Sequence, residues 1–269
     1  MNYSTIKYEV QEGILILRLN RPERMNAVNE EMYAEMSQLL QEFRENNDVR
    51  VVVLTGSIRI KDDVEKQAFC AGADLKKHSA GERTHAQKRQ YIEQAHEAMR
   101  LLYRYPKPVI AAVNGPARGA GAEMALACDF MIMSEEASIA FPETGLGTFV
   151  GGGVTLHLPR IVGLMKAKEL VYAGKVLGGA AAVEMGLALY SYPMATFMDQ
   201  VLEFAREIAR KAPISIAMAK RHLQGSSLLD LETVLRLETD AILACMDTED
   251  WQEGVQAFAE NRNPVYRGR

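Results

Sequence analysis

The sequence predicts a mixed α/β protein in which a largely parallel sheet is followed by a mainly helical C-terminal region. Two observations support this fold class. Up to about residue 140, short apolar runs typical of buried strands alternate with stretches of helical periodicity. After residue 158, the apolar residues recur almost entirely at helical spacing.

The first half of the chain contains the expected strands. Runs such as ILILRL and VVVLT are short, apolar and bounded by turn residues, which indicates strands at 14–19, 51–55, 109–113 and 130–133. Helices are expected over 30–46, with Asn29 as N-cap, and over 86–104. The charged, aperiodic stretch 57–67 is expected to form a surface loop.

The C-terminal third is expected to be helical. Periodic segments occur at 159–173, 180–186, 199–211, 214–224, 230–246 and 249–260. We therefore divide the chain into a core over residues 1–195, which holds the candidate site, and a helical region over residues 196–269.

Composition restricts the class of protein. Of the 269 residues, 48% are hydrophobic and 25% are charged, and the net charge is −4, which is ordinary for a globular protein and argues against nucleic acid as the main partner. No apolar run reaches the length of a membrane span, and the first residues do not resemble a targeting peptide. Three widely spaced cysteines indicate a reducing compartment, so we expect a cytoplasmic protein.

The first candidate site is AFCAGADLK at residues 68–76. Gly72 permits a positive φ, and its small neighbours allow a ligand to approach the backbone. The N–H of Ala73 can then point at an oxygen atom. The alternative is a tight turn into a helix capped by Asp74.

The second candidate is NGPARGAGAEMALACD at residues 114–129. A strand ends before it and a helix begins near Gly121, so unpaired N–H groups at the helix start can hold an oxyanion. Glu123 follows among apolar residues, where burial would raise its pKa toward the value that proton transfer requires. The alternative is that Glu123 only interacts with the helix dipole.

The third candidate is Glu143 in AFPETG, before the glycine-rich stretch 145–153. Alone it would be an ordinary surface acid. Together with Glu123 it forms a candidate pair of carboxylates that can divide the work on one water molecule: one removes a proton and the other delivers one to carbon. Two N–H donors that stabilise an enolate complete a site for proton chemistry beside an acyl carbonyl, with no metal required.

The ordered set AFCAGADL, PVIAAVNGPARGAGAEMALACDF and AFPETGLG closely resembles the crotonase, or enoyl-CoA hydratase/isomerase, superfamily. The likeness extends from NRPERMNAV to the closing FAENRNPVYRGR, which is nearly the whole chain. The resemblance implies a spiral of ββα units with a helical C-terminal region that mediates trimer contacts, and assembly as a trimer or a dimer of trimers.

The resemblance also implies roles for individual residues. The N–H groups of Ala73 and Ala120 would form the oxyanion hole for an acyl-CoA thioester, and Glu123 and Glu143 would be the catalytic acids. The residues that it places against coenzyme A are Arg24, Met25, Ala27, Ala71, Asp74, Leu75, Lys76 and Gly119.

The presence of both glutamates favours hydration of a 2-enoyl-CoA to a 3-hydroxyacyl-CoA, or the reverse dehydration, with no cofactor beyond the coenzyme A of the substrate. Double-bond isomerisation or another crotonase-type reaction is the alternative. A noncatalytic CoA-binding scaffold and a dinucleotide-binding protein fit less well, since Met124 occupies the third glycine position of a dinucleotide motif.

Two features depart from the family pattern. Ala120 stands where the family usually has glycine, so a methyl group narrows the space near the thioester. The segment 57–67 is longer than usual, and it either borders the CoA entrance or forms inert surface.

Overall fold

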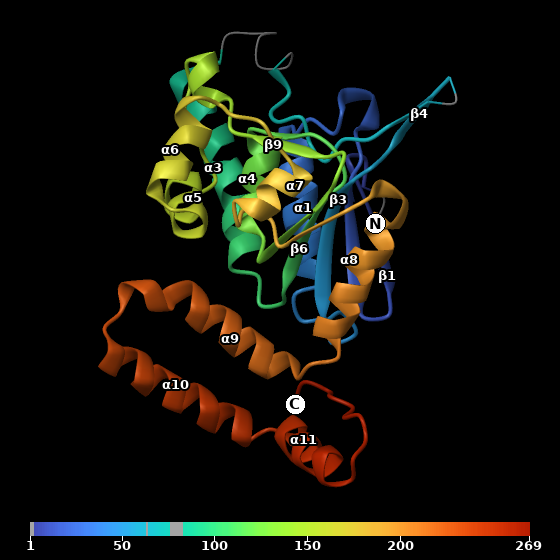
Figure 1. The fold of residues 1–269 in the computed structure, drawn as a ribbon, viewed down its shortest axis with the longest axis vertical. Coiled ribbons are helices and arrows are strands. Elements are labelled where there is room, and N and C mark those ends of the chain that lie inside the picture. Colours follow the sequence, from blue (N-terminus) through green and yellow to red (C-terminus); the bar gives the residue numbers. More distant parts are fainter. Residues whose placement is uncertain (1–2, 63, 76–82) are drawn as a thin grey trace.

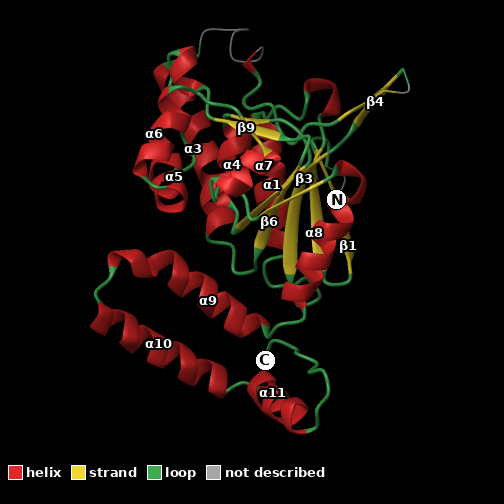
Figure 2. Cartoon of the chain, in the orientation of Figure 1, coloured by secondary structure: helices red, strands yellow, loops and turns green. Residues whose placement is uncertain are grey.

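The computed structural model describes residues 3–62, 64–75 and 83–269. Its main sheet has six strands in the order β1-β2-β3-β6-β8-β11. Figure 2 shows strands in yellow and the surrounding helices in red. The β1–β2 pair is an antiparallel hairpin, and all other neighbours in this sheet are parallel. The strands are β1 (Ile6–Gln11), β2 (Ile14–Leu19), β3 (Val51–Gly56), β6 (Val109–Val113), β8 (Phe130–Ser134) and β11 (Tyr190–Tyr192).

The central strands are apolar throughout because both faces of the sheet are covered. Along β2, Leu15 and Leu17 enter the larger hydrophobic cluster, whereas Ile14 and Ile16 enter a second cluster on the opposite face. The same alternation continues along β3 and β6. It explains why ILILRL and VVVLT show no alternation of apolar and polar residues.

Helices cover the two faces unequally (Figure 1). The larger cluster is closed by residues of α1, α3 and α4, and the second cluster by Phe197, Val201 and Ala205 of α8. The helices before the C-terminal arm are α1 (Glu30–Glu42), α3 (His85–Tyr103), α4 (Ala120–Ala127), α5 (Val154–Val162), α6 (Leu164–Tyr172), α7 (Gly179–Glu184) and α8 (Met194–Ala209).

A small second sheet, in the order β10-β9-β7, lies next to the candidate motifs. Its strands are β7 (Ala117–Arg118), β9 (Ser138–Ala140) and β10 (Leu177–Gly178). The strands β7 and β9 run parallel, and Gly119 N–H donates to Ala140 O at 3.3 Å just beyond them. This pairing brings the start of α4 beside the segment that leads to Glu143.

The last helices form an arm that extends away from the sheet (Figure 1). They are α9 (Pro213–Gly225), α10 (Leu231–Met246) and α11 (Glu249–Ala259), and the expected boundary at residue 195 falls earlier, at the start of α8. Among the described helices, none is both long enough and apolar enough to cross a membrane.

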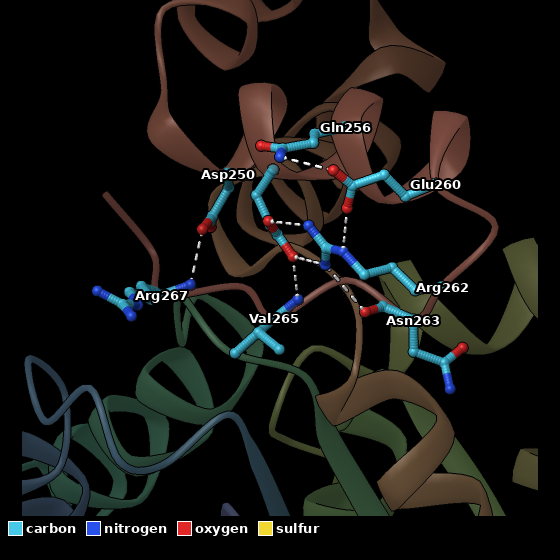
Figure 3. Close-up of polar contacts among 8 residues, drawn as sticks. Asp250, Gln256, Glu260, Arg262, Asn263, Val265 and Arg267 are labelled. Atoms are coloured by element: carbon cyan, nitrogen blue, oxygen red, sulfur yellow. Dashed lines mark hydrogen bonds and ion pairs between the residues drawn. The ribbon is translucent and has the colours of Figure 1, made fainter.

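The C-terminal tail folds back onto α11 (Figure 3). The buried carboxylate of Asp250 accepts hydrogen bonds from the backbone N–H groups of Arg267 and Gly268, at 2.6 and 2.8 Å. The guanidinium of Arg262 pairs with Glu253 and Glu260. These contacts hold the tail against the first and last turns of α11.

Several expected elements need correction. The segment 57–67 is not a plain loop, since β4 (Arg59–Lys61) and β5 (Val64–Lys66) pair as an antiparallel hairpin held by backbone hydrogen bonds rather than by an apolar face. The expected helix 159–173 begins earlier and is divided into α5 and α6 by Gly163, whose φ of 78° breaks the helix. The strand β1 was missed because only its Ile6 is buried.

Other expectations are confirmed. The strands expected at 14–19, 51–55, 109–113 and 130–133 correspond to β2, β3, β6 and β8. Helix α1 begins at Glu30 after Asn29, whose side-chain oxygen accepts a hydrogen bond from the N–H of Met32, although the helix ends at Glu42 rather than at residue 46.

Replacing Asn114 with alanine should destabilise the fold. The buried Asn114 carboxamide accepts from Gly56 N–H at 3.1 Å and donates to Gly56 O at 2.9 Å, which ties the end of β6 to the end of β3. Its loss leaves two buried backbone groups unpaired, so we expect the free energy of unfolding to fall by about 2 kcal/mol or more. Urea denaturation measures the change. The exposed Asn47→Ala should change stability by less than about 0.5 kcal/mol, and an equal loss in both variants would contradict the prediction.

Candidate active site

The two segments expected to supply the oxyanion hole run side by side. Cys70 N–H donates to Pro116 O at 3.1 Å, and Arg118 N–H donates to Cys70 O at 3.0 Å. Beyond this pairing, Gly72 has a φ of 99°, and a Cβ atom on it would lie 3.9 Å from Ala120 N. The backbone next to Ala73 therefore lies against the start of α4.

The N–H groups of both alanines are available to a ligand. Ala120 is the first residue of α4, where a helix leaves its N–H groups unpaired. Within the described residues, neither the Ala73 N–H nor the Ala120 N–H donates a hydrogen bond, and both residues are half-buried rather than sealed in the core. Two free donors at the positive end of a helix suit an oxygen atom that gains negative charge.

Glu123 lies one turn into α4 and is only 8% exposed. Its Oε1 accepts a hydrogen bond from the N–H of Gly151 at 2.7 Å. Burial raises the pKa of this carboxyl to about 7, although the Gly151 hydrogen bond opposes the shift and the charge of Glu143 adds to it. A carboxyl with a pKa near neutrality can both release and accept a proton under ordinary conditions.

Glu143 begins the short 3-10 helix η2 (Glu143–Leu146) and is 7% exposed. Its Oε1 lies 3.0 Å from the position that a Cβ atom on Gly119 would occupy, which places the carboxylate directly beside the start of α4. Its buried Oε2 has no hydrogen-bond partner among the described residues. Burial raises the pKa of this carboxyl as well.

The glycine-rich loop 151–153 closes the site over Glu123. A Cβ atom on Gly152 would lie 2.8 Å from Glu123 Cβ, and Gly152 and Gly153 both have positive φ. A side chain on this loop would displace the catalytic candidate. The glycines of this loop therefore leave the space that Glu123 occupies, and the N–H of Gly151 orients the Glu123 carboxylate.

The segment expected to meet coenzyme A lies beside the segment that contains Ala73. Arg24 ends the 3-10 helix η1 (Pro22–Arg24), and Met25 and Asn26 follow with φ of 52° and 56°. Ala71 N–H donates to Met25 O at 3.0 Å, and Asp74 N–H donates to Val28 O at 3.0 Å. Backbone hydrogen bonds thus hold the turn that contains Arg24, Met25 and Ala27 against residues 71–74.

Two side chains that the sequence analysis did not assign to the site hold this turn. The buried Asn26 amide donates to Ser57 O at 2.9 Å and to Ala68 O at 2.8 Å. Arg21 donates to Asp74 Oδ2 at 2.9 Å, so this carboxylate is paired within the protein. Leu75 and Met25 are exposed beside it, and Lys76 lies outside the described residues.

The pH dependence of stability should show that Glu123 is buried. A carboxyl whose pKa rises from 4.5 to about 7 on folding binds its proton more tightly in the folded state, so the folded state loses stability as the pH rises through this window. The free energy of unfolding of Glu123→Gln, relative to that of the wild type, should therefore increase by up to about 3 kcal/mol between about pH 4.5 and pH 8. Urea denaturation across this range measures the gain.

The exposed Glu184→Gln serves as the control, and its difference from wild type should stay constant across the same pH range. A stability difference between Glu123→Gln and wild type that does not change with pH would show that the folded state does not raise this pKa.

Comparisons with known proteins identify the family of the chain. The enoyl-CoA hydratase/isomerase family model matches residues 9–269. A putative enoyl-CoA hydratase/isomerase, YngF of Bacillus subtilis, is 39% identical over 96% of this chain and 95% of its own. A crotonyl-CoA hydratase of Syntrophomonas wolfei is 33% identical, with 97% of each chain covered.

Solved structures share the fold. An enoyl-CoA hydratase from Bacillus anthracis superposes with a TM-score of 0.92 at 35% identity, covering 99% of this chain and 100% of that one. The motifs, the fold and the match along nearly the full length lead to one conclusion: the chain belongs to the enoyl-CoA hydratase/isomerase family.

Proposed function

We propose that the protein hydrates a 2-enoyl-CoA to a 3-hydroxyacyl-CoA, or catalyses the reverse dehydration. The observation that carries the proposal is the arrangement of two buried carboxylates, Glu123 and Glu143, around the start of α4. There the N–H groups of Ala73 and Ala120 have no hydrogen-bond acceptor in the part of the chain that the structure describes. The relatives named crotonyl-CoA hydratase and short-chain-enoyl-CoA hydratase support the reaction type.

In this proposal the thioester oxygen accepts hydrogen bonds from Ala73 N–H and Ala120 N–H. These donors withdraw electron density from the conjugated double bond, so the β-carbon becomes electrophilic. They also stabilise the negative charge that develops on the oxygen when water attacks. Removing one donor of this kind from an enzyme typically costs about 3–4 kcal/mol of transition-state stabilisation.

The two carboxyl groups then move protons at the adjacent carbons. The water oxygen bonds to the β-carbon while one carboxylate accepts a water proton, and the electron pair of the double bond forms the enolate. The other carboxyl group delivers its proton to the α-carbon, so the product gains one water molecule. This division of work requires the pair to hold one proton, which suits two interacting acids whose pKa values are both raised.

Coenzyme A would lie along the turn 24–27 and the adjacent segment. Arg24 can meet a phosphate, and the exposed Met25 and Leu75 offer apolar surface to the pantetheine and adenine. Ala27, Ala71 and Gly119 have a small side chain or none, so they leave room for coenzyme A along this segment. Because its carboxylate pairs with Arg21, Asp74 would contribute mainly by holding the segment in place.

Self-association as a trimer or a dimer of trimers belongs to the same proposal. The C-terminal arm has an apolar groove of about 620 Å³ between α9 and α10, lined by Met218, Leu237 and Ile242 among others. Neither helix buries a residue within the described chain. An apolar surface of this kind normally meets a protein partner.

Analytical ultracentrifugation tests the assembly. We expect three or six copies for the wild-type protein, and a smaller species for Ile242→Glu, because a charge in the groove opposes its burial. Exposed Glu232→Gln, on the first turn of α10, should leave the assembly unchanged. A wild-type monomer would contradict the prediction.

The free thiols of Cys70, Cys128 and Cys245 are consistent with a reducing compartment such as the cytoplasm, and we infer this location.

Replacing either glutamate with glutamine should reduce hydration strongly. Glutamine keeps the shape of the side chain but cannot exchange a proton, so we expect kcat to fall about 10²–10⁴-fold in Glu123→Gln and in Glu143→Gln. Loss of the conjugated thioester absorbance measures the rate with but-2-enoyl-CoA and longer homologues.

Mass spectrometry of the product separates the candidate reactions. Hydration adds the mass of one water molecule, whereas isomerisation of the double bond adds none. The exposed Glu184→Gln should retain wild-type kcat. The hydratase mechanism would be wrong if both active-site variants kept more than a tenth of the wild-type rate with every enoyl-CoA tested.

A further inference from the structure

The glycine loop 151–153 is flanked by one face of α3. His96 Nε2 lies 3.3 Å from the position of a Cβ atom on Gly151, and Met99 Cγ lies 3.3 Å from the same position on Gly152. The ring of Tyr103 packs on that of His157, with centroids 4.5 Å apart. His96, Met99 and Tyr103 are spaced by three and four residues, so they form one stripe of the helix.

His96 is the member of this stripe that reaches the reacting groups. The Cβ position on Gly151 that lies 3.3 Å from His96 Nε2 also lies 3.2 Å from Glu123 Oε2. The imidazole and the carboxylate of Glu123 therefore both lie next to Gly151. Within the described residues no ion pair or hydrogen bond joins them, and Glu123 Oε1 accepts from the N–H of Gly151 instead.

The imidazole of His96 is free to meet a ligand. Its side chain is exposed, and it has no hydrogen-bond partner among the described residues. Its buried neighbours on the helix, Ala95 and Met99, are apolar. The ring is therefore an exposed polar group beside the buried side chain of Met99.

The order of groups around the start of α4 indicates which part of a substrate would reach His96. The thioester oxygen is bound at Ala73 and Ala120, and the α- and β-carbons lie at the two glutamates in the proposed mechanism. The turn 24–27, where coenzyme A would lie, is bonded to the segment around Ala73, whereas Gly151 and His96 lie beside Glu123. An acyl chain that continues past its β-carbon would thus pass His96.

We propose that His96 is a specificity-determining residue that hydrogen-bonds a polar substituent on the acyl group beyond the β-carbon. This inference rests on the proposed function. An imidazole can donate a hydrogen bond to such a group or accept one from it, whereas an alkyl chain offers it no hydrogen bond. The shared chemistry is a hydroxyl or carboxyl oxygen.

The experiment compares three substrates that share the same reacting carbons. They are but-2-enoyl-CoA, which ends in a methyl group, and its derivatives with a hydroxyl or a carboxyl group on the γ-carbon. We expect His96→Phe to reduce kcat/KM for at least one polar substrate about tenfold relative to but-2-enoyl-CoA, which is the size of one hydrogen bond. Whichever derivative loses more identifies the preferred oxygen.

Two further variants control the result. His96→Gln keeps an N–H donor and should retain more of the preference than His96→Phe. His85→Phe makes the same replacement at the exposed first residue of α3 and should leave all three rates unchanged. Circular dichroism confirms that each variant is folded.

Two results would overturn the inference. In the first, the ratio of kcat/KM for the polar substrates to kcat/KM for but-2-enoyl-CoA changes less than twofold in His96→Phe. In the second, kcat/KM falls equally for all three substrates, as it would if His96 served proton transfer or structure alone. Failure of the proposed function is a distinct result, since the wild-type protein would then hydrate none of the three substrates.

Discussion

The candidate site depends on one narrow passage through the molecule. The segment 67–72 passes between the ends of the central strands and the start of α4, where there is no room for side chains. A Cβ atom would lie 1.9 Å from Ala68 O on Gly56, 2.7 Å from Gln67 O on Gly115 and 2.3 Å from Cys70 O on Gly121. Because these three positions are glycines, the segment 67–72 can pass between them. The hydrogen bond from Arg118 N–H to Cys70 O then places Ala73 beside Ala120.

This passage explains why the candidate oxyanion hole consists of backbone groups. A rigid N–H pair, placed by neighbouring strands and a helix start, needs no reorganisation when charge develops on a thioester oxygen. The two carboxylates lower the stability of the fold. Because Glu123 and Glu143 are both buried, their charged forms are disfavoured, and the packing of the surrounding apolar core must offset this unfavourable free energy. The same burial that weakens the fold gives these groups the proton affinity that the proposed reaction needs.

Much of the core could be predicted from sequence because its signals are local. The strands near 14–19, 51–55 and 109–113 and the start of α1 depend on residues adjacent in the chain. The hairpin at 59–66 could not be recognised, since its strands are charged and exposed and only backbone pairing identifies them. Gly163 divides α5 from α6 through its φ, which periodicity does not reveal.

The site shows the same division between local and distant signals. The motifs around Ala73, Ala120, Glu123 and Glu143 could be identified from their residue types and order. Asn26, Arg21 and Gly151 could not be assigned their contacts, because each acts on a segment at least 28 residues away. The position of His96 beside Gly151 and Glu123 could not be recognised for the same reason, since nothing near it in the chain points to Glu123.

The two parts of the candidate site are therefore made in different ways. The candidate thioester site is formed by backbone N–H groups and glycines, so a change of side chain there either preserves the geometry or destroys it. The glycine loop beside Glu123 is flanked by two side chains of α3, His96 and Met99. Met99 is buried in the hydrophobic core, whereas His96 is exposed, so His96 can be exchanged without loss of core packing. In the proposed function, motifs consequently report the reaction class, whereas His96, a single residue that no motif contains, would select the acyl group.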